Sequence, residues 1–199
     1  MRNIIIGISL LLLSGCAIKP KYIVSVDSIG KIHKKTKYFL LSGLKDISTS
    51  NLEFQEYSKY IDKALKNRGF VKSDFENADV AIFLRYGISE PQNYTTLYSV
   101  PIYGKTSILP RNTYYTARYS IKGYQNRIRE YVLFTRYYEL NAIDLKFYKK
   151  TKKNQYIWKM IVTSTGASGE LRTIFPVLIA ASKRYIGINT GKKVKIKLY

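Results

Sequence analysis

Alternating apolar and polar positions mark two short segments of the chain. Residues 22–29 alternate apolar with small or polar side chains, and residues 193–199 alternate strictly between lysine or tyrosine and aliphatic residues. A period of two is typical of a strand with one buried face. Residues 37–44 form a compact apolar run, which also favours a strand. We therefore expect a strand in each of these three segments. A basic turn over residues 31–35 separates the strand over 22–29 from the strand over 37–44.

After the strand over 37–44, the apolar positions recur with a different period, close to that of an α-helix. Ser50 precedes Glu53 by three residues, which is the spacing of a capping box, and Arg68-Gly69 is typical of a helix end. Between them the apolar positions recur at helical spacing: Phe54, Tyr57, Ile61 and Leu65. The pattern predicts an amphipathic helix over about 51–67.

A second helical pattern lies near the C-terminal end. Ser168 is a candidate N-cap, and Pro176 lies inside the periodic segment. A proline removes one backbone donor and clashes with the preceding turn, so we expect a kink or a division into a turn plus a helix. The predicted buried stripe contains Leu171, Ile174, Leu178, Ala181 and Tyr185.

The middle of the chain is rich in Tyr, Ile, Val and Thr. Residues 78–88 predict a central strand, and an antiparallel meander is expected over 113–124, 131–148 and 155–165, with the lysines of 146–153 around a hairpin turn. Residues 90–112 contain three prolines and a glycine, so a long loop or a loosely paired excursion is expected there. Together these patterns predict an α+β fold: a two-layer sandwich of a mainly antiparallel sheet with two helices on one face.

The first sixteen residues carry a targeting signal. Arg2 precedes an apolar stretch, residues 4–13, which is shorter than the about 20 residues that a membrane-spanning helix needs. Leu13-Ser-Gly-Cys16 resembles the bacterial lipobox, which implies lipidation of Cys16 and removal of residues 1–15. An ordinary secretory signal with an incidental cysteine is the alternative. Cys16 is the only cysteine of the chain, so lipidation leaves no thiol for a disulfide.

The expected organisation follows from this signal. Residues 1–15 form a lipoprotein signal peptide, residues 16–21 a lipidated tether and residues 22–199 a single α+β domain. Ala17 stands where an aspartate would resemble the signal for retention in the inner membrane. We therefore expect a lipid-anchored protein of the cell envelope, at the outer membrane and facing the periplasm.

Charge is distributed unevenly along the 199 residues. The net charge is +21, and residues 91–199 contain 20 basic but only 4 acidic side chains. Such an excess favours anionic partners. The joint abundance of Lys, Ile, Asn and Tyr is also what AT-rich coding produces without selection for a ligand. Both interpretations remain open at this stage.

Basic and aromatic residues interleave in the expected meander, which combines cations with flat rings for stacking. The sequence predicts an anionic-ligand face there, for an acidic glycan, a lipid headgroup or an acidic protein ahead of nucleic acid. Strand alternation turns half of these side chains inward, so ordinary packing is the competing interpretation. The candidate residues of this face are Arg118, Lys122, Arg136, Tyr119 and Tyr124.

Other chemistry finds little support in the sequence. One His and one Cys exclude histidine-rich metal sites and disulfide frameworks, and His33 has no partner nearby in the sequence. Gly104-Lys-Thr106 lacks the first glycine and the flanking elements of a phosphate-binding loop. The spacing of Glu130, Glu139 and Asp144 alone does not indicate a carboxylate pair for hydrolysis. No catalytic residue, metal, nucleotide or other cofactor is predicted.

Several short segments resemble one bacterial lipoprotein family that is defined only by a domain of unknown function. They are the lipobox, Lys-Asn-Arg-Gly-Phe at 66–70, Ala-Asp-Val-Ala-Ile at 78–82, Trp158 followed by Ser-Thr-Gly at 164–166, and the segments 176–181 and 185–190. The resemblance implies a small α+β envelope lipoprotein and supplies no site. We expect a non-catalytic binding or scaffolding module; an envelope hydrolase or transferase with its site in the 90–112 loop is the alternative.

Overall fold

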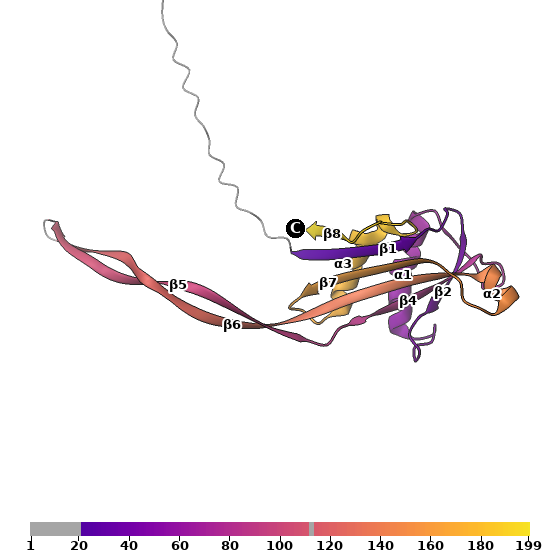
Figure 1. Ribbon diagram of the computed structural model, residues 1–199, viewed down its shortest axis with the longest axis horizontal. Coiled ribbons are helices and arrows are strands. Elements are labelled where there is room, and N and C mark those ends of the chain that lie inside the picture. Colours follow the sequence, from indigo (N-terminus) through magenta and orange to yellow (C-terminus); the bar gives the residue numbers. More distant parts are fainter. Residues whose placement is uncertain (1–20, 112–113) are drawn as a thin grey trace, which may run out of the picture.

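The computed structural model describes residues 21–111 and 114–199, with the side chains of 106–118 left aside (Figure 1). A 3₁₀ turn, Lys183–Tyr185, follows the last helix. The helices and strands in chain order are β1 (Tyr22–Gly30), β2 (Lys37–Ser42), α1 (Leu52–Asn67), β3 (Val71–Lys72), β4 (Val80–Ile88), β5 (Gln92–Arg111), β6 (Tyr114–Asp144), α2 (Leu145–Thr151), β7 (Tyr156–Gly166), α3 (Leu171–Ser182) and β8 (Val194–Leu198).

One large sheet organises the chain. Its strands lie in the order β3-β2-β4-β6-β7-β1-β8, and β5 pairs with β6 outside this path. All pairs are antiparallel except those of β2 with β3 and with β4. The expected α+β class is confirmed at this level: the described residues form three helices and a mostly antiparallel sheet of eight strands.

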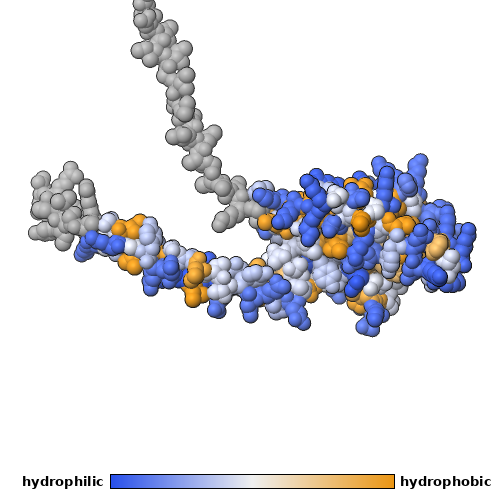
Figure 2. Space-filling view, viewed as in Figure 1, coloured by the Kyte–Doolittle hydropathy of each residue, from blue (hydrophilic) through white to orange (hydrophobic). Residues whose placement is uncertain are grey.

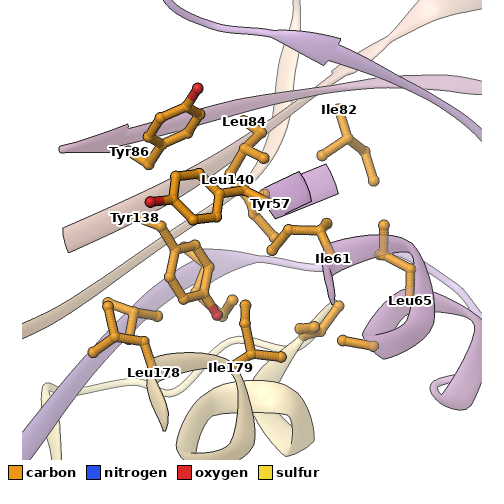
Figure 3. Close-up of a cluster of buried hydrophobic side chains, with 14 of the residues drawn as sticks. Tyr57, Ile61, Leu65, Ile82, Leu84, Tyr86, Tyr138, Leu140, Leu178 and Ile179 are labelled. Carbon is orange, nitrogen blue, oxygen red and sulfur yellow. The ribbon is translucent and has the colours of Figure 1, made fainter. Parts of the chain in front are cut away.

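Side chains of α1 and α3 form the main core with one set of sheet positions (Figure 3). Ile61 of α1 and Leu178 of α3 are fully buried with Tyr138 and Leu140 of β6. The stacked rings of Tyr57 and Phe175, 4.2 Å apart at their centroids, join the two helices. A smaller second cluster is formed by Ala78, Ala81, Ile143 and Leu145. Leu145 begins α2, so α2 packs in a different cluster from the other helices.

The predicted helix over 51–67 is confirmed, with a different cap. Asn51 is the N-cap, and its Oδ1 accepts a hydrogen bond from the backbone N–H of Phe54 at 3.1 Å. The predicted cap, Ser50, is instead 2.6 Å from the hydroxyl of Ser48. Both residue types satisfy the free donors of a first turn, so the sequence alone did not separate these neighbouring positions.

The C-terminal helix also differs in detail from the prediction. Helix α3 runs without interruption through Pro176, and its N-cap is Glu170 rather than Ser168. The hydroxyl of Ser168 accepts a hydrogen bond from the N–H of Glu170, and its carbonyl accepts one from Arg136. Ser168 therefore belongs to the turn before the helix.

Of the two expectations for residues 90–112, the long loop is wrong and the paired excursion is closer to the structure. Residues Gln92–Arg111 form β5, a strand of 20 residues, which pairs with the first part of β6. Because β5 has β6 on one side only, its outer edge needs no ladder hydrogen bonds, and an edge strand tolerates prolines such as Pro101. The two expected strands over 113–124 and 131–148 are one strand, β6, which ends at Asp144.

The lysine-rich segment over 146–153 is not a hairpin turn. Most of it belongs to α2, whose N-cap Asp144 accepts a hydrogen bond from the N–H of Phe147 at 2.9 Å. The strands expected over 22–29, 37–44, 78–88, 155–165 and 193–199 are confirmed within a few residues. Across the described ranges, no helix has the length and apolar character to cross a membrane.

Candidate functional site

A long two-stranded arm leaves the sheet (Figure 1). Strand β6 pairs with β4 and β7 from about Phe134 onward, but before that point it pairs only with β5. We call β5 and residues 114–133 of β6 the arm. At about 3.3 Å per residue, the 20 residues of β5 extend for about 66 Å. No helix packs on the arm among the described residues.

One face of the arm gathers cations and tyrosine rings. Tyr94 stands opposite Tyr131 with their ring centroids 5.8 Å apart, and the guanidinium of Arg129 lies 5.0 Å from the ring of Tyr98. Arg127 stands opposite Tyr98. We call this surface the basic face, and it contains Tyr94, Tyr98, Lys122, Arg127, Arg129 and Tyr131.

Lys122 reaches the basic face through an irregularity in β6. The pairing register shifts between Ile102 and Tyr103, which leaves Lys122 as an extra residue in β6. A Cβ atom added to Gly104 would lie 2.6 Å from Cγ of Lys122. Gly104 has the same parity as Tyr98 along β5, so the stem of Lys122 crosses the same face. The absence of a side chain at Gly104 provides the space for it.

The opposite face is apolar and exposed. Leu97 pairs directly with Ile128, and Tyr103 with Ile121. Leu97 is 71% exposed and Ile128 is 65% exposed, so neither side chain packs on another element. We call this surface the apolar face, and it contains Leu97, Tyr103, Tyr119, Ile121, Tyr124 and Ile128. Figure 2 shows hydrophobic residues recurring along the arm among hydrophilic ones.

The residues predicted for one anionic-ligand face do not share one surface. Lys122 lies on the basic face, whereas Tyr119 and Tyr124 lie on the apolar face, 62% and 67% exposed. The side chain of Arg118 lies outside the described part of the structure. Arg136 is only 2% exposed and belongs to the sheet rather than to the arm. Of the four whose side chains the structure describes, Lys122 alone is placed with other exposed cations.

Arg136 holds the turn between β7 and α3. Its Nε and Nη1 donate to the carbonyls of Ser164 and Ser168, at 3.2 and 2.7 Å, and its Nη2 donates to the hydroxyl of Ser164. Burial lowers the pKa of this guanidinium. None of the ion pairs formed by the described residues includes Arg136, so backbone oxygens replace a carboxylate as its partners.

The sequence interpretation missed the contribution of β5. Tyr94 and Tyr98 lie in the segment that was expected to be a loop, and they complete the basic face opposite Tyr131 and Arg127. The signal was present in Asn-Tyr-Thr-Thr-Leu-Tyr-Ser-Val (93–100), which is rich in residues that favour strands. The prolines and the glycine of the same segment favour loops, and they led to the expectation of a loop.

Two surface hollows contain ionisable side chains that could take part in catalysis or in metal binding. One, of about 340 Å³ at the base of the arm, is lined by residues 93–95 and 130–132, with Glu130 as its single carboxylate. The other, of about 270 Å³, combines Lys31, His33, Lys34 and Arg68, although Arg68 already donates to the carbonyl of Ile186. Among the described residues, no group of three or more His, Cys, Asp or Glu side chains is placed to hold a metal ion.

Comparisons with known proteins give structural similarity but no family. No family model matches the chain, and no curated protein does. A crystal structure of a PDZ domain protein from Parabacteroides distasonis ATCC 8503 is similar, with a TM-score of 0.43 and 10% sequence identity. The match covers 87% of this chain and 38% of the other, so this chain spans less than half the length of that protein.

Proposed function

We propose that this protein is a lipid-anchored, non-catalytic binding or scaffolding module of the cell envelope. Lipidation of Cys16 would precede cleavage after residue 15, and residues 16–21 would tether the domain to the outer membrane, facing the periplasm. We further propose a two-layer sandwich for the domain. Its support is that α1 and α3 contribute side chains to the same core cluster.

The basic face of the arm is the observation that carries the binding role. Lys122, Arg127 and Arg129 share it with three tyrosine rings, and all three cations are exposed. Cations and flat rings on one surface suit a ligand with acidic groups on an extended, partly apolar frame, such as an acidic glycan or an acidic protein segment.

The alternative is an envelope hydrolase or transferase with its site in the 90–112 segment. That segment is a paired strand, and the hollow beside it contains the single carboxylate of Glu130. Acid–base hydrolysis of a glycoside needs two carboxyl groups flanking the scissile bond. The arm therefore supports binding better than this kind of catalysis.

The binding role is tested by changing Lys122, Arg127 and Arg129 to Gln together. The probes are alginate, as an acidic polysaccharide, and polyglutamate, as an acidic peptide. Binding at low salt should weaken by about tenfold, because each exposed charge contact contributes about 0.5 kcal/mol and 1.4 kcal/mol corresponds to a factor of ten. The salt dependence of binding should flatten as well, since screening acts over about 10 Å.

A matched triple variant separates a binding face from net charge. Changing Lys193, Lys195 and Lys197 to Gln removes the same charge from exposed positions in and beside β8. This variant should bind as the unaltered protein does, with circular dichroism and melting showing that both variants are folded. Equal weakening by the two triples would contradict the proposal and favour coding bias as the origin of the charge.

A further inference from the structure

The apolar face of the arm continues the pattern of the protein core beyond the point where helices cover the sheet. In β6, Tyr138 and Leu140 face the main core. Positions of the same parity reach Ile128 and Tyr124 on the apolar face. On this one face of β6, the side chains are buried within the domain and exposed along the arm. An isolated two-stranded ribbon is marginally stable in water. Contact of the apolar face with another surface would therefore stabilise the arm.

The tether and the arm begin at the same end of the sheet. Ser164 of β7 pairs with Val24 of β1 on one side and with Arg136 of β6 on the other. The start of β1 therefore lies level with the part of β6 where the arm departs, as Figure 1 also shows. Five peptide steps join Cys16 to Lys21, and they span at most about 18 Å when fully extended.

These two facts select a lipid bilayer as the surface that covers the apolar face. A lipid on Cys16 would hold Lys21 within about 18 Å of the membrane. Strand β6 lies two strand spacings, about 10 Å, from β1, so the base of the arm would lie within about 28 Å of the bilayer, and an arm of about 66 Å is long enough to reach it.

Charge is segregated in part: Arg127 and Arg129 point to the opposite face. That face also includes the exposed Ile102, and the polar pair of Ser99 and Asn126 lies within the apolar face. Exceptions lie near the two ends of the apolar face, where Glu130 and Lys105 occur.

We propose that the arm lies along the membrane surface, with Leu97, Tyr124 and Ile128 at the boundary between headgroups and acyl chains and the basic face turned away from the bilayer. Amphipathic elements bury an apolar face about 5–10 Å into this boundary, and tyrosine is enriched there. The inference rests on the proposed anchor at Cys16. It also assigns the anionic ligand of the basic face to the aqueous side, as a glycan or protein rather than a headgroup.

Tryptophan placed on either face reports which one meets lipid. Tyr124→Trp introduces the probe on the apolar face, and Gln125→Trp introduces it one residue away on the basic face. The mature protein purified from membranes is reconstituted into phosphatidylcholine vesicles with brominated acyl chains. The native Trp158 is buried and provides a constant background. We expect quenching at position 124 and little at position 125.

Serine substitutions connect the quenching to the apolar face. Leu97→Ser should reduce the quenching of the tryptophan at 124, because an apolar side chain is removed from the boundary. Val100→Ser makes a similar change on the basic face and should leave the quenching unaltered. Intact-mass measurement of the same sample reports lipidation of Cys16 separately, so a failure of the anchor and a failure of the arm are distinguished.

Two results would overturn the inference. Equal quenching at 124 and 125, or none at either, would show that the apolar face does not meet lipid. A concentration-dependent blue shift of the tryptophan at 124 without vesicles, together with a larger mass in sedimentation, would show that a second copy of the chain covers the face instead. A difference between 124 and 125 in protein with lipid on Cys16 supports the inference. The same difference in protein without that lipid would support contact of the apolar face with lipid but would contradict the anchor that orients the arm.

Discussion

At the scale of single residues, alternation along β6 decides the role of each charged side chain. Arg136 and Glu139 are three residues apart and therefore lie on opposite faces of the sheet. Arg136 faces the helices and is satisfied by carbonyl and hydroxyl oxygens. Glu139 is opposite Arg85 and interacts with Lys159 on the outer face. The same strand thus contains a buried cation and a partly covered anion, each with its own kind of partner.

Glu139 should make the stability of the fold depend on pH in the acidic range. Burial alone would raise the pKa of its carboxyl, but hydrogen bonds from Lys159 and Asn141, both at 2.8 Å, and the charges of Lys159 and Arg85 lower it overall. A lowered pKa in the folded state contributes stability above the unfolded-state pKa, and this contribution is lost as the pH falls through the folded-state pKa.

The measurement is urea unfolding of the unaltered protein and of Glu139→Gln at a series of pH values. The free energy of unfolding of the variant should be lower near neutral pH, and the difference should shrink as the solution is acidified. Glu90→Gln is the control, because Glu90 is exposed and lies outside the helices and strands. A difference that stays constant at every pH would contradict the expected role.

At the scale of elements, α1 depends on its contact with the sheet and with α3. Its buried stripe, Phe54, Tyr57, Ile61, Ala64 and Leu65, has the spacing of one helical face. Ile61 is in the middle of this stripe and is fully buried (Figure 3). The helix is 16 residues long, which is marginal for an isolated helix in water. Packing of the stripe therefore provides most of its stability.

Ile61→Ala should lower the free energy of unfolding by about 2–5 kcal/mol, the usual cost of a large-to-alanine change in a core. The reason is the lost apolar burial together with the cavity that remains. Urea unfolding measures the change, and Lys63→Ala, at an exposed position of the same helix, should alter stability little. An unchanged transition midpoint for Ile61→Ala would show that this side chain is not essential to the core.

The arm is the element with the least support from the rest of the fold. Its strands have one partner each, and both outer edges carry unpaired backbone groups over the described residues. Natural edges are often protected from aggregation by charged side chains, prolines and bulges. The arm contains all three, in Arg127 and Arg129, Pro101 and the register shift at Lys122. These features oppose edge-to-edge pairing while leaving both faces free for contacts.

At the scale of the whole molecule, the tether and the arm together define an orientation. Residue 21 lies at the end of the sheet from which the arm departs, whereas α2 follows the opposite end of β6. An anchor at Cys16 would therefore place the arm next to the membrane and α2 away from it. The proposed membrane contact of the apolar face depends on this anchor, whereas the binding role of the basic face rests on the arm itself.

Cys16→Ser should abolish lipidation and shift the protein from the detergent-extracted membrane fraction to the soluble fraction, or leave an uncleaved precursor. The physical reason is that each buried methylene of an acyl chain contributes about 0.8 kcal/mol, and two or three chains anchor stably. Fractionation and intact-mass analysis measure the outcome. An unaltered protein that retains residues 1–15, or that carries no added lipid, would contradict the prediction.

Local patterns in the sequence determined the elements that bury one face. The apolar stripe of α1 and the strands over 22–29 and 78–88 follow from periods that each segment contains by itself. The resemblance of residues 13–16 to a lipobox is equally local, because a signal peptide is recognised as a short stretch of chain. These features needed no knowledge of neighbouring segments in space.

Only the tertiary structure decided the candidate site. Tyr98 and Arg127 meet because β5 and β6 pair across almost thirty residues of sequence, and no local period shows which positions become cross-strand neighbours. Arg136 and Arg127 have similar surroundings in the sequence, yet one is buried beneath the turn before α3 and the other is exposed on the arm. The physical reason is that β6 has β7 and the helices beside it only from about Phe134 onward. Before Phe134, in the arm, the described side chains on both faces of β6 are exposed to solvent.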